Sequence, residues 1–446
     1  MDELRKNMLI EADITGYTHE GHGVCRVDGR AVFVPRTLPG ERWLIRLVRV
    51  SRTAVWGRAE ELRSAPSPER CEPDCPVYGR CGGCATRHMR YEEELRFKLG
   101  RVNDALQRIA GLELRADRIH AAPATEGYRN KAIYNLAPGP TVGFYRARSH
   151  EVIRTDRCAL LPDGFDRTAA ALTEIMTERG IPAYDETDGS GQIRHLLLRR
   201  FGPNFLACVT ATAPLPDGMA GELMRRCPEL TGVVECINPL PGNAVTDGIM
   251  NTCAGSKHVT VELCGAIFLL DARSFFQVNT AQAEVLYNLV REYAEPTGRS
   301  VLDLYCGVGS IGIAAARDAS LLIGSDIVPE AVENARINAD ANGLPDAEYI
   351  TGDASDVAQK LADRGLRPEI IIVDPPRKGL GPAVIEAIGR MAPEKLVYVS
   401  CDPATLARDL RELTTVGLTP RRAAAVDLFP RTRHVETVVL MSRKAD

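Results

Sequence analysis

The last third of the chain carries a regular alternation that restricts its fold. From Ser300 onward, apolar runs alternate with stretches of helical pattern, and the runs are residues 301–305, 321–327, 370–373 and 396–399. Such alternation is typical of a parallel, doubly wound sheet with helices on both faces. We therefore expect residues 272–446 to form an α/β domain of Rossmann-like fold.

A glycine-rich turn follows the first apolar run. Gly307, Gly309 and Gly312 form the pattern G-x-G-x-x-G between a predicted strand and a predicted helix. Asp326 follows nineteen residues after Gly307, at the end of the next predicted strand. This spacing matches the dinucleotide fingerprint, in which glycines let the backbone approach the ligand and the acid binds a ribose hydroxyl. Taken alone, it favours an NAD enzyme about as well as a methyltransferase.

Acidic residues recur at the other predicted strand ends. Asp303 precedes the glycine turn, Asp353 follows the third strand and Asp374 follows the fourth. Each acid by itself could cap a helix, but the series resembles the strand-end motifs of class I S-adenosylmethionine-dependent methyltransferases. The resemblance implies contacts with the methionine, ribose and adenine parts of the cofactor from Gly307, Gly309, Ser310, Asp326 and Asp353.

A thiol stands at the end of the last apolar run of this series. Cys401 closes the run and is followed by Asp402 and Pro403, where a helix is predicted to begin. In a parallel α/β sheet this edge presents reactive groups to a ligand. Cys401 is therefore a candidate nucleophile, with a buried core thiol as the alternative. A helix N-terminus would favour the thiolate, and the charge of Asp402 would oppose it.

The composition restricts the class of protein. The 446 residues are 45% hydrophobic and 26% charged, and they include no apolar run or leader segment of the kind that enters a membrane. We expect a globular cytoplasmic protein of two to four domains with no membrane contact. The net charge of −4 argues against a general polyanion binder. Residues 129–157 nevertheless carry six Lys or Arg against two acids, a basic stretch that can guide a nucleic acid.

The first 64 residues read as short strands separated by turns. Asp28 and Gly29 between apolar stretches predict a hairpin. Several closely spaced strands predict a small barrel of the OB type over residues 1–64. The Pro- and Ser-rich segment 64–68 then reads as a linker. Residues 65–271 mix helical and strand-like patterns, and we assign them to an α+β central domain.

Four cysteines are concentrated at the start of this central region. The chain has 13 cysteines, an odd number that a disulfide framework explains poorly in a large chain without a secretion signal. The spacing Cys71-x3-Cys75-x5-Cys81-x2-Cys84 predicts a four-thiolate zinc or iron–sulfur site.

Motifs spread over almost the whole chain carry a more specific resemblance. They are Phe275-Phe276-Gln277-Val278-Asn279, Asp374-Pro375-Pro376-Arg377-Lys378-Gly379, Ser400-Cys401-Asp402-Pro403 with residues 405–410, and His434-Val435-Glu436. These motifs resemble the RNA (uracil-5-)-methyltransferase family. Residues 20–24, 33–35 and 38–41 resemble the TRAM domain that some members carry at the N-terminus.

The resemblance implies methylation of a uridine at C5. Uracil C5 is too weak a nucleophile to attack a methyl sulfonium, so a thiolate must first add to C6. A base must then remove the C5 proton before the thiol leaves. The family implies Cys401 as nucleophile and Glu436 as base, with Glu436 at the start of an antiparallel last strand. It further implies a cofactor and uracil pocket lined by Gln277, Tyr305, Asp326 and Asp374.

The rRNA branch of the family gives the cysteines a role. Its members hold a [4Fe–4S] cluster on a C-x5-C-x2-C run plus one distant cysteine. The resemblance therefore implies Cys75, Cys81, Cys84 and Cys158 as ligands and leaves Cys71 spare. A cluster used for radical chemistry would require a C-x3-C-x2-C triad, which the sequence lacks.

Several functional alternatives stay open at this stage. The TRAM-like barrel and the cysteines favour 23S rRNA as substrate, although related enzymes with these parts methylate tRNA. A catalytically inactive RNA-binding or assembly protein is a second class, and an NAD oxidoreductase is a third. We expect the protein to be a monomer that uses S-adenosylmethionine and an iron–sulfur cluster.

Overall fold

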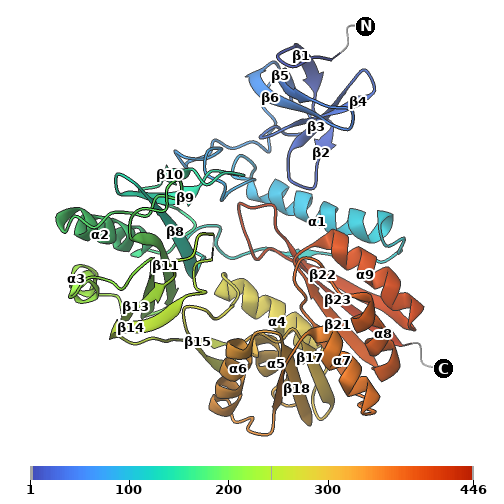
Figure 1. The fold of residues 1–446 in the computed structure, drawn as a ribbon. Coiled ribbons are helices and arrows are strands. Elements are labelled where there is room, and N and C mark those ends of the chain that lie inside the picture. Colours follow the sequence, from blue (N-terminus) through green and yellow to red (C-terminus); the bar gives the residue numbers. More distant parts are fainter. Residues whose placement is uncertain (1–3, 243, 444–446) are drawn as a thin grey trace.

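The structure, a computed structural model, describes residues 4–242 and 244–443. Its strands form three large sheets and one two-stranded hairpin. Figure 1 shows the N-terminal sheet at the top, the central sheet on the left and the C-terminal sheet at the lower right. Within the described residues, no helix has the length and apolar character needed to cross a membrane.

The N-terminal sheet has six strands in the order β1-β5-β6-β4-β3-β2. Their bounds are β1 (Leu9–Asp13), β2 (Gly16–Tyr17), β3 (Gly23–Val27), β4 (Arg30–Val34), β5 (Arg42–Val50) and β6 (Val55–Leu62). The predicted hairpin joins β3 to β4. Asp28 at φ 50° and Gly29 at φ 77° are both left-handed, as a two-residue type I′ turn requires.

The central sheet has seven strands in the order β10-β9-β8-β11-β12-β13-β14. Their bounds are β8 (Lys131–Ala137), β9 (Thr141–Tyr145), β10 (Val152–Arg154), β11 (Ile193–Phe201), β12 (Asn204–Ala211), β13 (Gly232–Ile237) and β14 (Ile249–Gly255). Helices α2 (Phe165–Glu178) and α3 (Met219–Arg226) pack in one apolar core with this sheet. Leu197 and Leu206 belong to a second core, which the sheet shares with the C-terminal domain.

The C-terminal sheet has eight strands in the order β19-β18-β17-β20-β21-β23-β22-β7. The strands of its C-terminal part are β17 (Ser300–Leu304), β18 (Leu321–Asp326), β19 (Glu348–Thr351), β20 (Ile370–Val373), β21 (Lys395–Ser400), β22 (Leu418–Val426) and β23 (Glu436–Arg443). The first five strands in this order are parallel, whereas β23 runs antiparallel to β21. The predicted Rossmann-like sheet is therefore confirmed, and so is its antiparallel last strand.

Helices cover both faces of this sheet. On one face lie α4 (Thr280–Ala294), α5 (Ser310–Ala316) and α6 (Pro329–Ala341). On the other lie α1 (Tyr91–Arg108), α7 (Ala354–Asp363), α8 (Pro382–Met391) and α9 (Pro403–Thr415). The inner strands β17, β18, β20 and β21 are almost fully buried, which is why they read as continuous apolar runs in the sequence.

Segments from before residue 272 also join this sheet and its core. Strand β7 (Ile119–His120) pairs in parallel with β22, and α1 packs on the same domain. The hairpin of β15 (Val259–Leu263) and β16 (Ala266–Leu270) shares a core with α4. The domain ranges 1–64, 65–271 and 272–446 remain predictions. Parts of 65–271 pack with the sheet formed by 272–446. A two-residue strand such as β7 is too short to leave a recognisable periodic pattern in the sequence.

Candidate active site

Cys401 and Glu436 meet at the edge where the parallel strands end. Strands β21 and β23 are antiparallel, and their register pairs Ser400 with Thr437. Cys401 is the residue after Ser400, and Glu436 is the residue before Thr437. The same register therefore places Cys401 opposite Glu436, across one strand pair. Residues far apart in the sequence become neighbours at this edge.

The thiol of Cys401 lies among carboxyl groups. Burial, together with the charges of Glu436 and Asp374, raises its pKa to about 11, while Arg377 opposes this shift. The N-terminus of α9 beside it is capped by Asp402, whose Oδ1 accepts N–H groups of Ala404 at 2.9 Å and Thr405 at 3.1 Å. The free protein therefore holds a neutral thiol, which must lose its proton as the sulfur attacks.

Two of these carboxyl groups titrate near neutral pH. Burial raises the pKa of Glu436, which is only 3% exposed, to about 8, and Asp374 adds to this shift while Arg377 opposes it. Burial also raises the pKa of Asp374 to about 7. Carboxyl groups with pKa values close to the working pH can both accept and release protons, as general acid–base catalysis requires.

The glycine turn lies at the same edge, between β17 and α5. Asp326, at the end of β18, accepts the N–H of Gly307 at 3.0 Å and the N–H of Val328 at 2.9 Å. Gly309 has a φ of 78°, and a Cβ there would lie 2.8 Å from the side chain of Ile313. The backbone of the turn is thus fixed next to Asp326, in the arrangement that the fingerprint predicts.

Asp303 supports this turn from inside the domain. The side chain is 1% exposed, and its Oδ2 accepts the N–H of Gly312 at 2.9 Å. A Cβ on Gly312 would approach that same oxygen to 2.8 Å. Burial raises the pKa of Asp303 to about 8. Asp303 therefore stabilises the glycine turn. Gly312 is needed because a side chain there would prevent α5 from packing this closely against Asp303.

The other predicted cofactor residues have different surroundings. Asp353 is exposed and caps α7, accepting the N–H of Ser355 at 2.9 Å, so the capping role that the sequence left open is real. Tyr305 follows β17 with a φ of 69°. Burial raises its pKa to about 12, and Asp353 contributes to that shift. Ser310 begins α5, and its hydroxyl accepts the Tyr287 hydroxyl at 3.0 Å.

Gln277 lies in the segment that precedes α4. The residue is 6% exposed, and its carbonyl accepts the side-chain N–H of Asn130 at 2.9 Å. The same Asn130 amide donates to Thr280 at 3.0 Å. Asn130 stands just before β8 of the central sheet and was not recognised in the sequence, because nothing local links it to a residue 147 positions away.

Asp409 is a second residue that the sequence motifs did not assign. It is 1% exposed, and its Oδ2 accepts the Tyr398 hydroxyl and the Leu380 N–H, both at 2.7 Å. Gly379, with a φ of 75°, passes so close that a Cβ would lie 2.3 Å from that oxygen. Asp409 thereby fixes the end of segment 374–380, which carries Asp374 to the site. The only sequence signal was its position in the helix after Cys401.

The predicted metal ligands come from two distant segments. Burial raises the pKa of Cys84 to about 12, and the neighbouring thiols of Cys158, Cys81 and Cys75 raise it in the same direction. The Sγ of Cys71 lies 3.4 Å from the carbonyl of Arg87 and 3.2 Å from that of Met89. Cys84 thus interacts electrostatically with the other three predicted ligands, whereas Cys71 contacts backbone carbonyl groups.

The arrangement does not form a single-ion site. In residues 4–242 and 244–443, no three His, Cys, Asp or Glu side chains gather closely enough to hold one metal ion. The zinc interpretation has no support for that reason, and an iron–sulfur centre is not shown. The donor set still suits a larger group, since four thiolates can each bind a different iron of a cluster. A cluster also tolerates nearby cations, and Arg87 acts on Cys84.

Comparison with known proteins identifies the family. Residues 265–444 match the family described as tRNA (Uracil-5-)-methyltransferase, and residues 6–59 match the TRAM domain. An uncharacterized RNA methyltransferase of Bacillus cereus is 38% identical over 99% of this chain and 98% of its own length. The chain belongs to the RNA (uracil-5-)-methyltransferase family. The prediction from the sequence is confirmed, and so is the N-terminal TRAM domain.

Other relatives of this RNA methyltransferase agree with the assignment. An uncharacterized RNA methyltransferase of Halalkalibacterium halodurans is 36% identical over 99% of this chain and 98% of its own. A crystal structure of the Pyrococcus abyssi tRNA (uracil-54, C5)-methyltransferase with S-adenosyl-L-homocysteine is 26% identical. It superposes with a TM-score of 0.80, covering 97% of this chain and 99% of that one. The protein is an enzyme that uses S-adenosylmethionine, and the NAD alternative was wrong.

Proposed function

We propose that this methyltransferase converts a uridine of 23S rRNA to 5-methyluridine, with Cys401 as nucleophile and Glu436 as general base. The observation that carries the proposal is the register of β21 and β23, which sets Cys401 opposite Glu436 at the sheet edge beside the glycine turn. A nucleophile, a base and a cofactor turn at one edge are the parts that methylation of C5 needs.

The proposed reaction follows from the charges at this edge. Cys401 adds to C6 of the uracil, and its proton passes to Asp374, whose pKa of about 7 leaves it partly ionised. S-adenosylmethionine supplies the methyl group to C5. Glu436 in its ionised form then takes the C5 proton, and the bond between C6 and the Cys401 sulfur breaks to restore the ring double bond. The target base must leave its stack to reach this edge, which costs about a few kcal/mol.

The choice of RNA rests on the domain composition. A TRAM domain and four clustered cysteines support rRNA, in accord with the family branch that carries both. The Pyrococcus enzyme acts on tRNA and covers almost the whole chain in superposition, so tRNA is the second candidate. The catalytic proposal is the same for both RNAs.

The substrate can be decided in cells. We expect deletion of the gene to remove one or more 5-methyluridines from 23S rRNA while the 5-methyluridine of tRNA is unchanged. Mass spectrometry of nuclease digests from both RNA classes measures this, and complementation with the wild-type gene is the control. Loss confined to tRNA would transfer the proposal to tRNA, and an unchanged pattern in both would overturn it.

We further propose that Cys75, Cys81, Cys84 and Cys158 hold a [4Fe–4S] cluster. The C-x5-C-x2-C spacing supports this set, as do the charge interactions of Cys84 with the other three thiols and the contacts of Cys71 with carbonyl groups. Methyl transfer involves no change of oxidation state. The proposed contribution of the cluster is therefore to hold the cysteine-rich segment to the central domain near the RNA.

Iron analysis of two variants tests this ligand set. Cys158→Ser is expected to lose the iron and the brown absorbance of the purified protein, because a ligand is missing. Cys71→Ser is the matched control and is expected to retain both, since Cys71 faces the carbonyls of Arg87 and Met89. Iron retained in Cys158→Ser and lost in Cys71→Ser would show that the cluster uses a different set of thiols.

A further inference from the structure

The segment that leads into Glu436 has no strand partners of its own, yet it is held at many points. Residues 427–435 connect β22 to β23. The Arg431 carbonyl accepts backbone N–H groups of Ala85 at 3.0 Å and Thr86 at 3.3 Å, and the Pro430 carbonyl accepts the Tyr128 hydroxyl at 2.9 Å. Arg431 also has a left-handed φ of 67°, which a side chain other than glycine adopts only where its surroundings impose it. The entry into β23 is therefore fixed from outside.

One stripe of helix α1 supplies several more of these contacts. Tyr91, Glu94, Lys98 and Arg101 recur at intervals of three and four residues, so they lie on one side of the helix. All four contact segment 427–435. The Tyr91 hydroxyl donates to Asp427 at 2.8 Å, and Arg101 donates to the carbonyl of Arg433.

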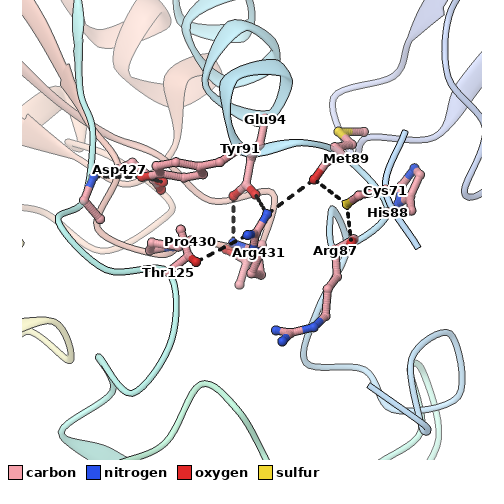
Figure 2. A network of polar contacts seen from close by, with 12 residues as sticks. Cys71, Arg87, His88, Met89, Tyr91, Glu94, Thr125, Asp427, Pro430 and Arg431 are labelled. Carbon is pink, nitrogen blue, oxygen red and sulfur yellow. Dashed lines mark hydrogen bonds and ion pairs between the residues drawn. The ribbon is translucent and has the colours of Figure 1, made fainter. Parts of the chain in front are cut away.

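Lys98 is at the centre of the stripe. Its ammonium group is fully buried and uses its three donors on Glu94 at 2.6 Å, Asp427 at 2.6 Å and the carbonyl of Phe429 at 3.1 Å. Glu94 in turn accepts the backbone N–H of Arg431 at 2.7 Å. Figure 2 shows Glu94 directed from α1 toward Arg431, with Tyr91 directed at Asp427. The Arg431 guanidinium also lies 3.7 Å from Glu94, so Lys98 and Arg431 balance the charges of Glu94 and Asp427.

A contribution to stability does not by itself explain the buried ion pairs of Lys98 with Glu94 and Asp427. Buried ion pairs contribute little net stability compared with apolar residues of the same size, because each charge loses its hydration. They do impose one geometry, since every donor must meet its acceptor. Here the acceptors are a side chain and carbonyls of the segment that delivers Glu436 to the site.

We infer that Lys98, together with Arg101 on the same stripe, is a positioning residue that sets Glu436 at the distance from the substrate needed to remove the C5 proton. This inference rests on the proposed role of Glu436. It predicts a specific defect. Addition of Cys401 to C6 and transfer of the methyl group would proceed, but proton removal would be slow. The enzyme would then remain bonded to the methylated RNA through Cys401.

The test uses the full-length protein and an RNA substrate that the wild type methylates. Lys98→Met is expected to slow release of 5-methyluridine about 100-fold, as a small displacement of a catalytic group can. Protein–RNA adducts on a denaturing gel should rise correspondingly, with the RNA concentration for half-maximal rate unchanged. Lys98→Met leaves two buried carboxyls without their cation, so it can fail to fold.

Arg101→Met keeps the test decisive in that case, because its acceptor is an uncharged carbonyl and no buried charge loses its partner. We expect the same adduct at about a 10-fold slower release, since the segment loses only one of its restraints. Arg96→Met is the matched control, since Arg96 lies on the exposed side of α1 and pairs with Glu93 and Glu69. Wild-type behaviour is expected for it.

The outcomes separate this inference from the proposed function. Folded Lys98 or Arg101 variants that are slow without accumulating adduct would overturn the positioning role, provided that Glu436→Gln accumulates it. Absence of adduct in Glu436→Gln itself would overturn the assignment of the base, and the inference with it. A rise in adduct in all three variants and not in Arg96→Met would support both.

Discussion

Cys401→Ala is expected to abolish methylation of the RNA. Without the sulfur there is no addition to C6, and C5 cannot attack a methyl sulfonium, so the rate should fall at least about 10,000-fold. Transfer of radiolabelled methyl groups to RNA measures this. The carboxyls around Cys401 would remain, and with them the surrounding fold.

Two comparisons make the result specific to the nucleophile. Iron content should equal that of the wild type, because the predicted cluster ligands lie in other segments. Cys253→Ala, which removes an exposed thiol on β14, should keep full activity. Methylation by Cys401→Ala at the wild-type rate would exclude covalent catalysis by this residue.

Glu436→Gln is expected to halt the reaction after methyl transfer. Glutamine matches the shape of glutamate but cannot accept the C5 proton, so turnover should fall about 100- to 10,000-fold. The methylated RNA should stay attached through Cys401 and appear as a slower band on a denaturing gel. Glu60→Gln is the control, since Glu60 pairs with arginines on the surface of the TRAM domain. Turnover without adduct would show that another group removes the proton.

The same substitution should change how stability depends on pH. Burial raises the pKa of Glu436 to about 8 from the ordinary value of 4.5, so the folded protein binds this proton more tightly than the unfolded chain. The stability contributed by the neutral carboxyl is complete below the unfolded value and is lost as the pH rises through 8. Glu436→Gln should therefore raise the melting temperature at pH 8.5, by a stabilisation on the order of a few kcal/mol, and change it little at pH 4. An equal change in melting temperature at both pH values would contradict the raised pKa of Glu436.

The local patterns of the sequence determined much of the site. Alternating apolar runs predicted the sheet, because buried parallel strands and their covering helices each leave a periodic trace. Residues at the strand ends then predicted Asp326 and Cys401 at one edge, since parallel strands end on the same side. The hairpin at Asp28 and Gly29 followed from turn chemistry alone.

Other features depended on contacts between distant segments. The family resemblance predicted an antiparallel last strand that begins at Glu436, but the pairing register that sets Glu436 opposite Cys401 came from the structure. Only domain packing brought Asn130 to the carbonyl of Gln277. The ionisation of Cys401 was also beyond the sequence. The helix N-terminus favoured a thiolate and Asp402 opposed it, so the sequence left the charge open, whereas burial beside two carboxyls favours the neutral thiol.

The sequence by itself determined the family, the three kinds of domain and the chemical groups available for methylation of uracil C5. The tertiary structure alone decided which groups meet and how Lys98 on α1 holds the segment before Glu436. The physical reason is that periodicity and turn preferences act over a few residues. Burial, pairing register and charge interactions depend on parts of the chain that come together only when it folds.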